Sequence, residues 1–315
     1  MPIDRTQPLL VTQSLTRKYG DFTALSDLTL TVHRGEVFAY IGPNGSGKTT
    51  TFRILCGLLD PTGGKAIIDG KDVTGNKDLI KSLVGYLPDN FGVYPTLRVW
   101  EYCDFFAAAY RIPKKDRAER IEKCLQIANA IEFRDKLMGA LSRGMKQRVG
   151  IAKTLLHDPA VLILDEPAAV IDPRARVAMR QLLRDLADLG KAVLVSSHIL
   201  PELADVADTV GILSQGKLVA CGPVQEIMRN VRQKRLVQIT VLSNVDKARQ
   251  VLTRAPGEWT ILPESKGEGV LRYEVQANEQ QLAETLKLLT GSGVDVMNFN
   301  EVPADLEDVF MTLTK

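Results

Sequence analysis

The sequence predicts an α/β domain with a largely parallel sheet, followed by a smaller α+β domain. From about residue 9 to 230, short apolar runs that are typical of strands alternate with helical patterns. Between about 96 and 140 the helical pattern continues without strands, which indicates an inserted helical subdomain. After the charged stretch "RNVRQKR" at 229–235 the pattern changes again. We therefore expect domains at 1–230 and 236–315, with the helical subdomain at about 90–155.

Four apolar runs are the clearest strands of the first domain. Three of them end at polar residues, and ligands of α/β sheets bind outside the carboxyl ends of the strands. The sequence thus places a binding site at that edge of the sheet. The four runs are "EVFAYI" (36–41), "AVLILD" (160–165), "AVLVSS" (192–197) and "TVGILS" (209–214).

The second domain shows a ferredoxin-like order of elements. "LVQITVL" predicts a strand, "VDKARQVLTR" a helix, "WTILP" and "VLRYEVQ" two strands, "EQQLAETLKLLTG" a helix and "VDVMNF" a strand. The order β-α-β-β-α-β is that of the ferredoxin-like fold. A last helix is expected in "DLEDVFMTLT".

The charge balance gives no support for broad binding to nucleic acid or to an anionic membrane surface. The 315 residues include 40 Lys and Arg against 38 Asp and Glu, a net charge of +2. The four cysteines, Cys56, Cys103, Cys124 and Cys221, form no CxxC pair, so we interpret them as reduced thiols of a cytoplasmic protein. We expect neither a signal peptide nor a membrane-spanning segment, so a membrane role requires a partner.

A phosphate-binding loop is predicted at "GPNGSGKT", between the strand 36–41 and a helix that begins near Lys48. Glycines let backbone N–H groups surround an anion, and the helix N-terminus adds positive potential. Lys48 is expected to reach the outer phosphates, and the Thr49 hydroxyl to ligate Mg²⁺. A glycine-rich turn without function is the alternative. The expected nucleotide contacts are Gly42, Pro43, Asn44, Gly45, Ser46, Gly47, Lys48, Thr49 and Thr50.

Two carboxylates follow the apolar strand of "VLILDEP", where they are costly unless a cation or water uses them. We expect Asp165 to hold Mg²⁺ through water and Glu166 to polarise the attacking water. The alternative for Asp165 is a cap on the next helix, before Pro167.

Two further side chains are candidates for the same site. His198 follows the strand 192–197 and is placed to contact the γ-phosphate or the water, although a single histidine in such a position is more often structural. Tyr19 is a candidate stacking platform for adenine, and the alternative is an aromatic residue at a strand edge.

The stretch "LSRGMKQR" at 141–148 has no acid, histidine or cysteine. Ser142 is a good N-cap, and Met145, Val149, Ala152 and Leu156 recur at helical spacing. A capped helix of this kind directs free N–H groups and positive potential outward from 142–145. The alternative is a capped amphipathic helix with no binding role.

The order and spacing of these motifs resemble the nucleotide-binding subunit of ABC transporters over about residues 9 to 225. The resemblance implies a phosphate-loop ATPase of the ABC type that binds ATP and Mg²⁺ and forms a head-to-tail homodimer. In that family a motif usually written LSGGQ binds the γ-phosphate held by the opposite subunit, and here it reads Leu141, Ser142, Arg143, Gly144, Met145. The form "LS-x-GM-x-QR" and a small domain ending in "DLEDVF" are similar to subunits of exporters.

Arg143 and Met145 depart from the LSGGQ form, and the chain departs from the family pattern at two further places. Asp89 of "GYLPDN" stands where the family has a glutamine that meets Mg²⁺ and the membrane subunit, and it is shorter and anionic. The loop after the carboxylates, usually close to SGLD, reads Ala169, Val170, Ile171, Asp172. Asp172 is retained, but valine adopts a positive φ with difficulty, so we expect an altered contact across the dimer and slow turnover.

The leading hypothesis is an ATPase subunit that closes around two ATP molecules and drives a separate integral membrane permease. The resemblance implies that the direction of transport is export. Such a subunit is peripheral on the inner face of the cell membrane, and the region 86–140, with Phe91, Val93 and Tyr94, is its expected coupling surface. A soluble ABC ATPase acting on DNA or the ribosome is a second hypothesis, which the near-neutral charge and the single phosphate loop disfavour. A nucleotide-gated regulatory module with little turnover is the third.

Overall fold

The computed structural model describes residues 4–169, 172–198, 203–227, 235–261 and 269–302. The chain divides into two compact units, Met1–Val224 and Gln225–Lys315. A hydrophobic core lies inside each of them. The expected linker 229–235, apart from Arg235, and the expected last helix at 305–314 fall outside the described residues.

The first unit contains two sheets. One is antiparallel, with the strand order β2-β1-β4-β5. The other has the order β10-β9-β3-β8-β7-β6, in which β10 is antiparallel and the remaining strands are parallel. The bounds are β1 Pro8–Tyr19, β2 Phe22–His33, β3 Val37–Ile41, β4 Gly63–Ile68, β5 Lys71–Asp72, β6 Val84–Leu87, β7 Val161–Leu164, β8 Ala192–Ser197, β9 Thr209–Ser214 and β10 Lys217–Pro223.

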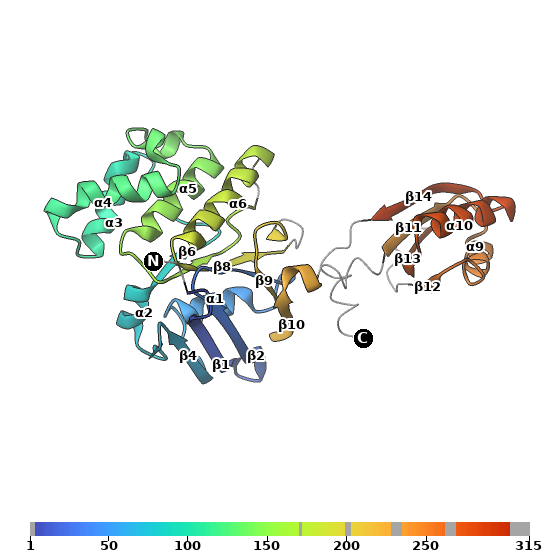
Figure 1. The fold of residues 1–315 in the computed structure, drawn as a ribbon, viewed down its shortest axis with the longest axis horizontal. Coiled ribbons are helices and arrows are strands. Elements are labelled where there is room, and N and C mark those ends of the chain that lie inside the picture. The colour runs from blue at the N-terminus through green and yellow to red at the C-terminus, as the bar shows by residue number, and fades with distance from the viewer. Residues whose placement is uncertain (1–3, 170–171, 199–202, 228–234, 262–268, 303–315) are drawn as a thin grey trace. The chain divides into compact units, whose positions relative to one another are not determined.

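Three helices of this unit lie apart from its antiparallel sheet. In Figure 1, α3, α4 and α5 lie together at one end of the unit, and strands β1, β2 and β4 lie at the other. The helix α1 follows β3 directly and begins at Lys48. The bounds are α1 Lys48–Leu55, α2 Lys77–Leu83, α3 Val99–Ala109, α4 Lys114–Ile127, α5 Arg143–Leu155 and α6 Pro173–Asp188, with 3₁₀ turns at Ile131–Phe133 and Met138–Ala140.

The central strands are apolar because the parallel sheet is covered on both faces. Every residue of β3, β7 and β8 is buried. The runs predicted as strands at 192–197 and 209–214 coincide with β8 and β9, and the other two differ from β3 and β7 only at their ends.

The separate antiparallel sheet was not predicted. The expectation of a largely parallel sheet from residue 9 onward is wrong for the first two strands, because β1 and β2 form a long hairpin in which Tyr19 pairs with Phe22. The turn between them passes through Gly20, whose φ of +57° lies in the left-handed region that glycine adopts without strain.

The second unit has the predicted ferredoxin-like topology. Its strands are all antiparallel in the order β12-β13-β11-β14, and two helices and Val294 supply the rest of the core. The α/β first unit and this second unit confirm the predicted fold class. The bounds are β11 Arg235–Val241, α9 Val245–Leu252, β12 Glu258–Ile261, β13 Val270–Gln276, α10 Glu279–Gly291 and β14 Val296–Val302.

All four cysteines are among the described residues and are free. Cys56, Cys103 and Cys124 are buried, whereas Cys221 is exposed. Burial raises the pKa of the Cys103 thiol to about 12 and that of Cys124 to about 11, so both stay protonated at neutral pH. In the described part of the chain, no helix combines the length and the hydropathy that crossing a bilayer requires.

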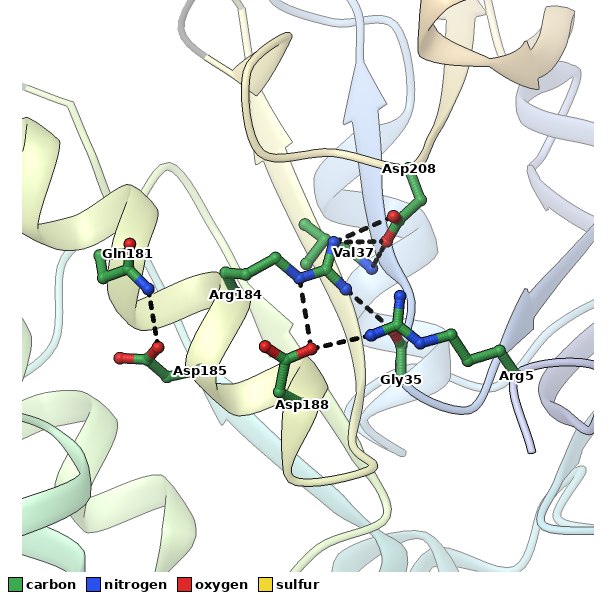
Figure 2. A network of polar contacts seen from close by, with 8 residues as sticks. All are labelled: Arg5, Gly35, Val37, Gln181, Arg184, Asp185, Asp188 and Asp208. Atoms are coloured by element: carbon green, nitrogen blue, oxygen red, sulfur yellow. Dashed lines mark hydrogen bonds and ion pairs between the residues drawn. The ribbon is translucent and has the colours of Figure 1, made fainter. Parts of the chain in front are cut away.

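A polar network anchors the C-terminal end of α6 (Figure 2). The Arg184 guanidinium donates to both carboxylate oxygens of Asp208, at 2.9 and 3.0 Å, and to the carbonyl of Gly35 at 3.0 Å. Asp208 also accepts from the backbone N–H of Val37 at 2.9 Å. Because Gly35, Val37 and Asp208 lie where β3 and β9 begin, the network fastens α6 to the amino edge of the parallel strands.

Changing Arg184 to Met should lower the free energy of unfolding of the first unit by about 1.5–3 kcal/mol, since hydrogen bonds to charged groups are lost while the aliphatic stem is kept. Urea unfolding followed by Trp100 fluorescence, in a Trp259→Phe background, measures this unit separately. Arg180→Met is the matched control on the same helix. Its partner Asp205 is 75% exposed, so a loss of about 0.2–1 kcal/mol is expected. Equal losses for both variants would contradict the anchoring role.

Candidate active site

The predicted phosphate loop connects β3 to α1. Gly47 is the N-cap of α1 with φ +110°, and a Cβ at this position would lie 2.8 Å from the carbonyl oxygen of Ala24. Only glycine therefore fits here. The first N–H groups of α1 have no intrahelical partner, and the positive end of the helix dipole lies at the same place. This loop has the local structure of an anion-binding site.

A cavity of about 430 Å³ opens beside this loop. It brings together residues from β1, β2, the loop, α1 and the segments that follow β6 and β7. Gly42 and Ser46 of the predicted set belong to the loop but do not line the cavity, and the buried Ser46 hydroxyl has no hydrogen-bond partner. The lining residues are Tyr19, Phe22, Ala24, Pro43, Asn44, Gly45, Gly47, Lys48, Thr49, Thr50, Asp89, Asp165 and Glu166.

Lys48 is the cation of this cavity. Its side chain is buried, and its ammonium donates to the carbonyl oxygens of Gly42 and Pro43 within the loop. Burial lowers the pKa of Lys48, while the negative charges of Glu166 and Asp165 oppose this shift. A buried ammonium that has only neutral acceptors attracts an anion.

Asp165 is buried at the end of β7 and accepts a hydrogen bond from the Ser196 hydroxyl at 2.7 Å. Burial raises the pKa of Asp165; the Ser196 hydrogen bond opposes the rise, and the charge of Asp89 adds to it. A cation near this carboxyl would favour its ionised form. The alternative that Asp165 caps the next helix is wrong, because Asp172 is the N-cap of α6 and accepts from Ala175 N–H at 2.9 Å.

Glu166 adopts a left-handed backbone conformation with φ +49°, which is strained for a residue with a side chain. Its N–H donates to the Ser196 hydroxyl at 2.9 Å, and its Oε2 lies 3.0 Å from Nδ1 of His198. The structure thus brings together the two residues that the sequence singled out as catalytic candidates. The Glu166 side chain is 16% exposed and His198 is 51% exposed, so water reaches the pair.

The sequence interpretation missed Ser196 and Phe22. Ser196 contacts both acidic residues, and the signal for it was the pair of serines that ends the otherwise apolar strand "AVLVSS". Phe22 lines the cavity and is 66% exposed. It faces Tyr19 across the hairpin turn. The Arg17 guanidinium lies 4.5 Å from the centre of the Tyr19 ring.

The residues of "LSRGM" lie outside this cavity. Ser142 caps α5 as predicted, accepting from Met145 N–H at 3.4 Å, and Leu141 is buried just before it. Of the four residues predicted to form an apolar face, Val149, Ala152 and Leu156 are buried, whereas Met145 is partly exposed. Gly144 lies in the first turn of α5 and is partly exposed.

The remaining predictions concern the loop before α6 and the metal. Val170 and Ile171 are outside the described residues, so the expected effect of valine is not described by the structure. Among the residues that the structure describes, no three His, Cys, Asp or Glu side chains meet closely enough to hold a metal. The cavity does offer oxygen donors from Thr49 and Asp165, the ligand type that Mg²⁺ prefers alongside phosphate and water.

Two family models match the chain. Residues 25–169 match the model described as ABC transporter, and residues 222–314 match the model described as ATP-binding protein DrrA1-3-like, C-terminal domain. These two regions fall in the first and the second compact unit, with a few residues of overlap at the boundary.

Curated relatives and solved structures agree with these matches. An uncharacterized ABC transporter ATP-binding protein, all4389 of Nostoc, is 39% identical over 65% of this chain. The matching region spans 61% of the length of that relative. The bacitracin transport ATP-binding protein BcrA of Bacillus licheniformis is 34% identical over 97% of each chain. A solved structure, the dimeric structure of MJ0796, a bacterial ABC transporter cassette, is 27% identical with a TM-score of 0.61 over 69% of this chain and 99% of its own.

Three observations lead to one assignment. They are the phosphate loop beside a lysine and two acidic residues, the topology of both units, and the similarity to BcrA along nearly the whole chain. This chain belongs to the family of ABC transporter ATP-binding proteins.

Proposed function

We propose that the chain binds ATP with Mg²⁺ and hydrolyses it as one half of a head-to-tail homodimer, which drives a separate integral membrane permease in export. The observation that carries this proposal is the cavity in which Lys48 and the phosphate loop face Asp165 and Glu166. It combines an anion cradle with the acidic groups that metal-assisted phosphoryl transfer needs.

Nucleotide binding uses the loop and the aromatic edge of the cavity. Backbone N–H groups of the loop and the Lys48 ammonium bind the phosphates. The Lys48 ammonium exchanges the loop carbonyls for phosphate oxygens when ATP enters. Tyr19 stacks on adenine through the ring face that Arg17 leaves uncovered. Phe22 closes the same end of the cavity.

Thr49, Asp165 and Asp89, which line the cavity, would hold Mg²⁺ together with phosphate oxygens and water. Mg²⁺ binds through few protein ligands in nucleotide sites and keeps several waters, which suits a cavity that lacks a complete protein cage. When bound, the ion neutralises the charge that develops on the phosphates. Ser196 holds the Asp165 carboxylate in position through its 2.7 Å hydrogen bond.

Hydrolysis depends on Glu166 and His198. Water attacks the γ-phosphorus, the bond to the β–γ bridging oxygen breaks, and Glu166 accepts the proton of the water, so that ADP and inorganic phosphate form. His198, 3.0 Å from Glu166, orients this carboxylate and contacts the γ-phosphate. The strained backbone of Glu166 directs its side chain toward the cavity.

The second copy completes each site. Residues Leu141, Ser142, Arg143, Gly144 and Met145 lie outside the cavity of their own chain, and the first N–H groups of α5 lack intrahelical partners. In a head-to-tail dimer they meet the γ-phosphate bound by the other copy, and Asp172 contributes beside them. The similarity to the dimeric MJ0796 cassette supports this arrangement.

The proposed transport uses a separate integral membrane permease, a partner that the similarity to the bacitracin transport protein BcrA supports. At such a permease the chain would act in the cytoplasm, on the inner face of the membrane. The "GM" form of its signature and the DrrA-like second unit favour export, and the similarity to BcrA supports a transport role. The coupling surface lies around the loop after β6 and α3, where Tyr94 and Phe105 are each 50% exposed.

Changing Lys48 to Ala should reduce Mg²⁺-dependent ATP hydrolysis by about 10²- to 10³-fold, because a charge that stabilises the transferred phosphoryl group is lost. Phosphate release measures the rate. Lys65→Ala, at an exposed position of β4, is the control that keeps the wild-type rate. If wild type were no faster than Lys48→Ala, the nucleotide-gated regulatory module would replace the ATPase.

Changing Glu166 to Gln should keep ATP binding and accumulate an ATP-bound dimer, since the proton acceptor is removed while the shape of the side chain stays. Size-exclusion chromatography with light scattering at saturating ATP measures the mass. Adding Ser142→Ala should return the double variant toward monomer. A Glu166→Gln protein that remains monomeric would rule out the head-to-tail model.

Affinity purification of the chain from detergent-solubilised membranes should recover an integral membrane subunit, because the proposed function depends on such a partner. Mass spectrometry identifies what copurifies. Ribosomes or nucleic acid in its place would exclude the transporter proposal.

A further inference from the structure

Arg143 and Asp89, two residues at which this chain departs from the usual family pattern, contact each other. The Arg143 guanidinium donates to the Asp89 carboxylate at 2.9 Å, and the two side chains are 47% and 50% exposed. Arg143 is the first residue of α5, and Asp89 follows β6. The ion pair therefore joins the signature helix to the edge of the nucleotide cavity within one chain.

Asp89 also faces the cavity. It lines the same space as Asp165 and Glu166, and its charge is close enough to raise the pKa of Asp165. Three carboxylates thus surround a cavity whose lining contains one cation, Lys48. The Asp89 carboxylate thus lies between Arg143 and the cavity, where the proposed function expects a cation.

The loop that carries Asp89 is fastened to α5 at further points. A Cβ on Gly150 would lie 2.7 Å from the Phe91 ring, so the ring packs directly on the helix backbone. The Lys153 ammonium lies 5.9 Å from the centre of the same ring. These contacts keep Asp89 within reach of Arg143. The pair also offsets the unfavourable placement of a cation at the positive end of the α5 dipole.

We propose that Arg143 competes with Mg²⁺ for the carboxylate of Asp89 and thereby lowers the metal affinity of the nucleotide site. The proposal rests on the proposed function of this site. A carboxylate that shares its charge with a guanidinium attracts a second cation less strongly, and the attraction falls further because both partners are half exposed. Arg143 acts on the metal through Asp89 and is a positioning residue.

The test measures the affinity for N-methylanthraniloyl-ATP by fluorescence, in EDTA and in Mg²⁺, for the full chain. The metal dependence is the dissociation constant in EDTA divided by the dissociation constant in Mg²⁺, so a larger ratio means that the metal contributes more to binding. Arg143→Gln should raise this ratio by about two- to fivefold, the range expected for an exposed ion pair. Asp89→Asn should lower it. In the Asp89→Asn background, Arg143→Gln should then have no effect on the ratio.

Arg148→Gln is the matched control, because it removes the same charge from the same helix. Arg148 donates to the Asn129 carbonyl and lies near Glu132, away from Asp89. Its ratio should equal that of wild type. Circular dichroism of each variant shows whether it is folded, and Arg143→Lys, which keeps the charge, should lie between wild type and Arg143→Gln.

The outcomes distinguish failure of this proposal from failure of the proposed function. An unchanged ratio in folded Arg143→Gln, or an equal change in the Asp89→Asn background, overturns the competition and leaves the ATP site intact. An equal change in Arg148→Gln overturns it as well, since a general charge effect would then suffice. Wild-type protein that binds no nucleotide, or binds it independently of Lys48, overturns the proposed function and this inference together.

Discussion

Acidic side chains at the end of a buried strand need partners, and this requirement organises the cavity. Asp165 follows β7, all of whose residues are buried, and Ser196 of the neighbouring strand satisfies it. The parallel register pairs Leu164 with Val195, so the next residue of each strand meets the other. The same hydroxyl accepts from the N–H of Glu166. One serine therefore contacts the carboxylate of Asp165, proposed to hold the metal, and the backbone of Glu166, whose side chain is proposed to polarise the water.

Two helices, α5 and α6, are connected to the parallel sheet by polar contacts. The N-terminal turn of α5 is joined to the cavity by the ion pair of Arg143 and Asp89, and α6 begins at the Asp172 cap and is anchored by Arg184 at the opposite edge of the sheet. The first link is exposed and polar, and such contacts exchange partners at little cost. The second is part of a more buried network. The arrangement suits a fixed sheet with an adjustable edge.

Much of the fold was predictable because strand and helix patterns are local. The runs of the parallel strands are continuously apolar, and the six elements of the second unit were found in the predicted order. The antiparallel hairpin of β1 and β2 was missed, because pairing between strands depends on contacts that a periodic pattern does not identify. The sequence patterns of β1 and β2 do not determine whether these strands join the parallel sheet or form a separate sheet.

Some features of the candidate site were likewise predictable from the sequence, and others were not. Residue types and spacing by themselves determined the phosphate loop, Lys48 and the Ser142 cap, because each depends on a few consecutive residues. Only the tertiary structure decided that Ser196 joins Asp165 to Glu166, that His198 meets Glu166, and that Arg143 meets Asp89. These contacts span 30 residues or more of sequence, and the register of parallel strands and the packing of a loop on α5 create them.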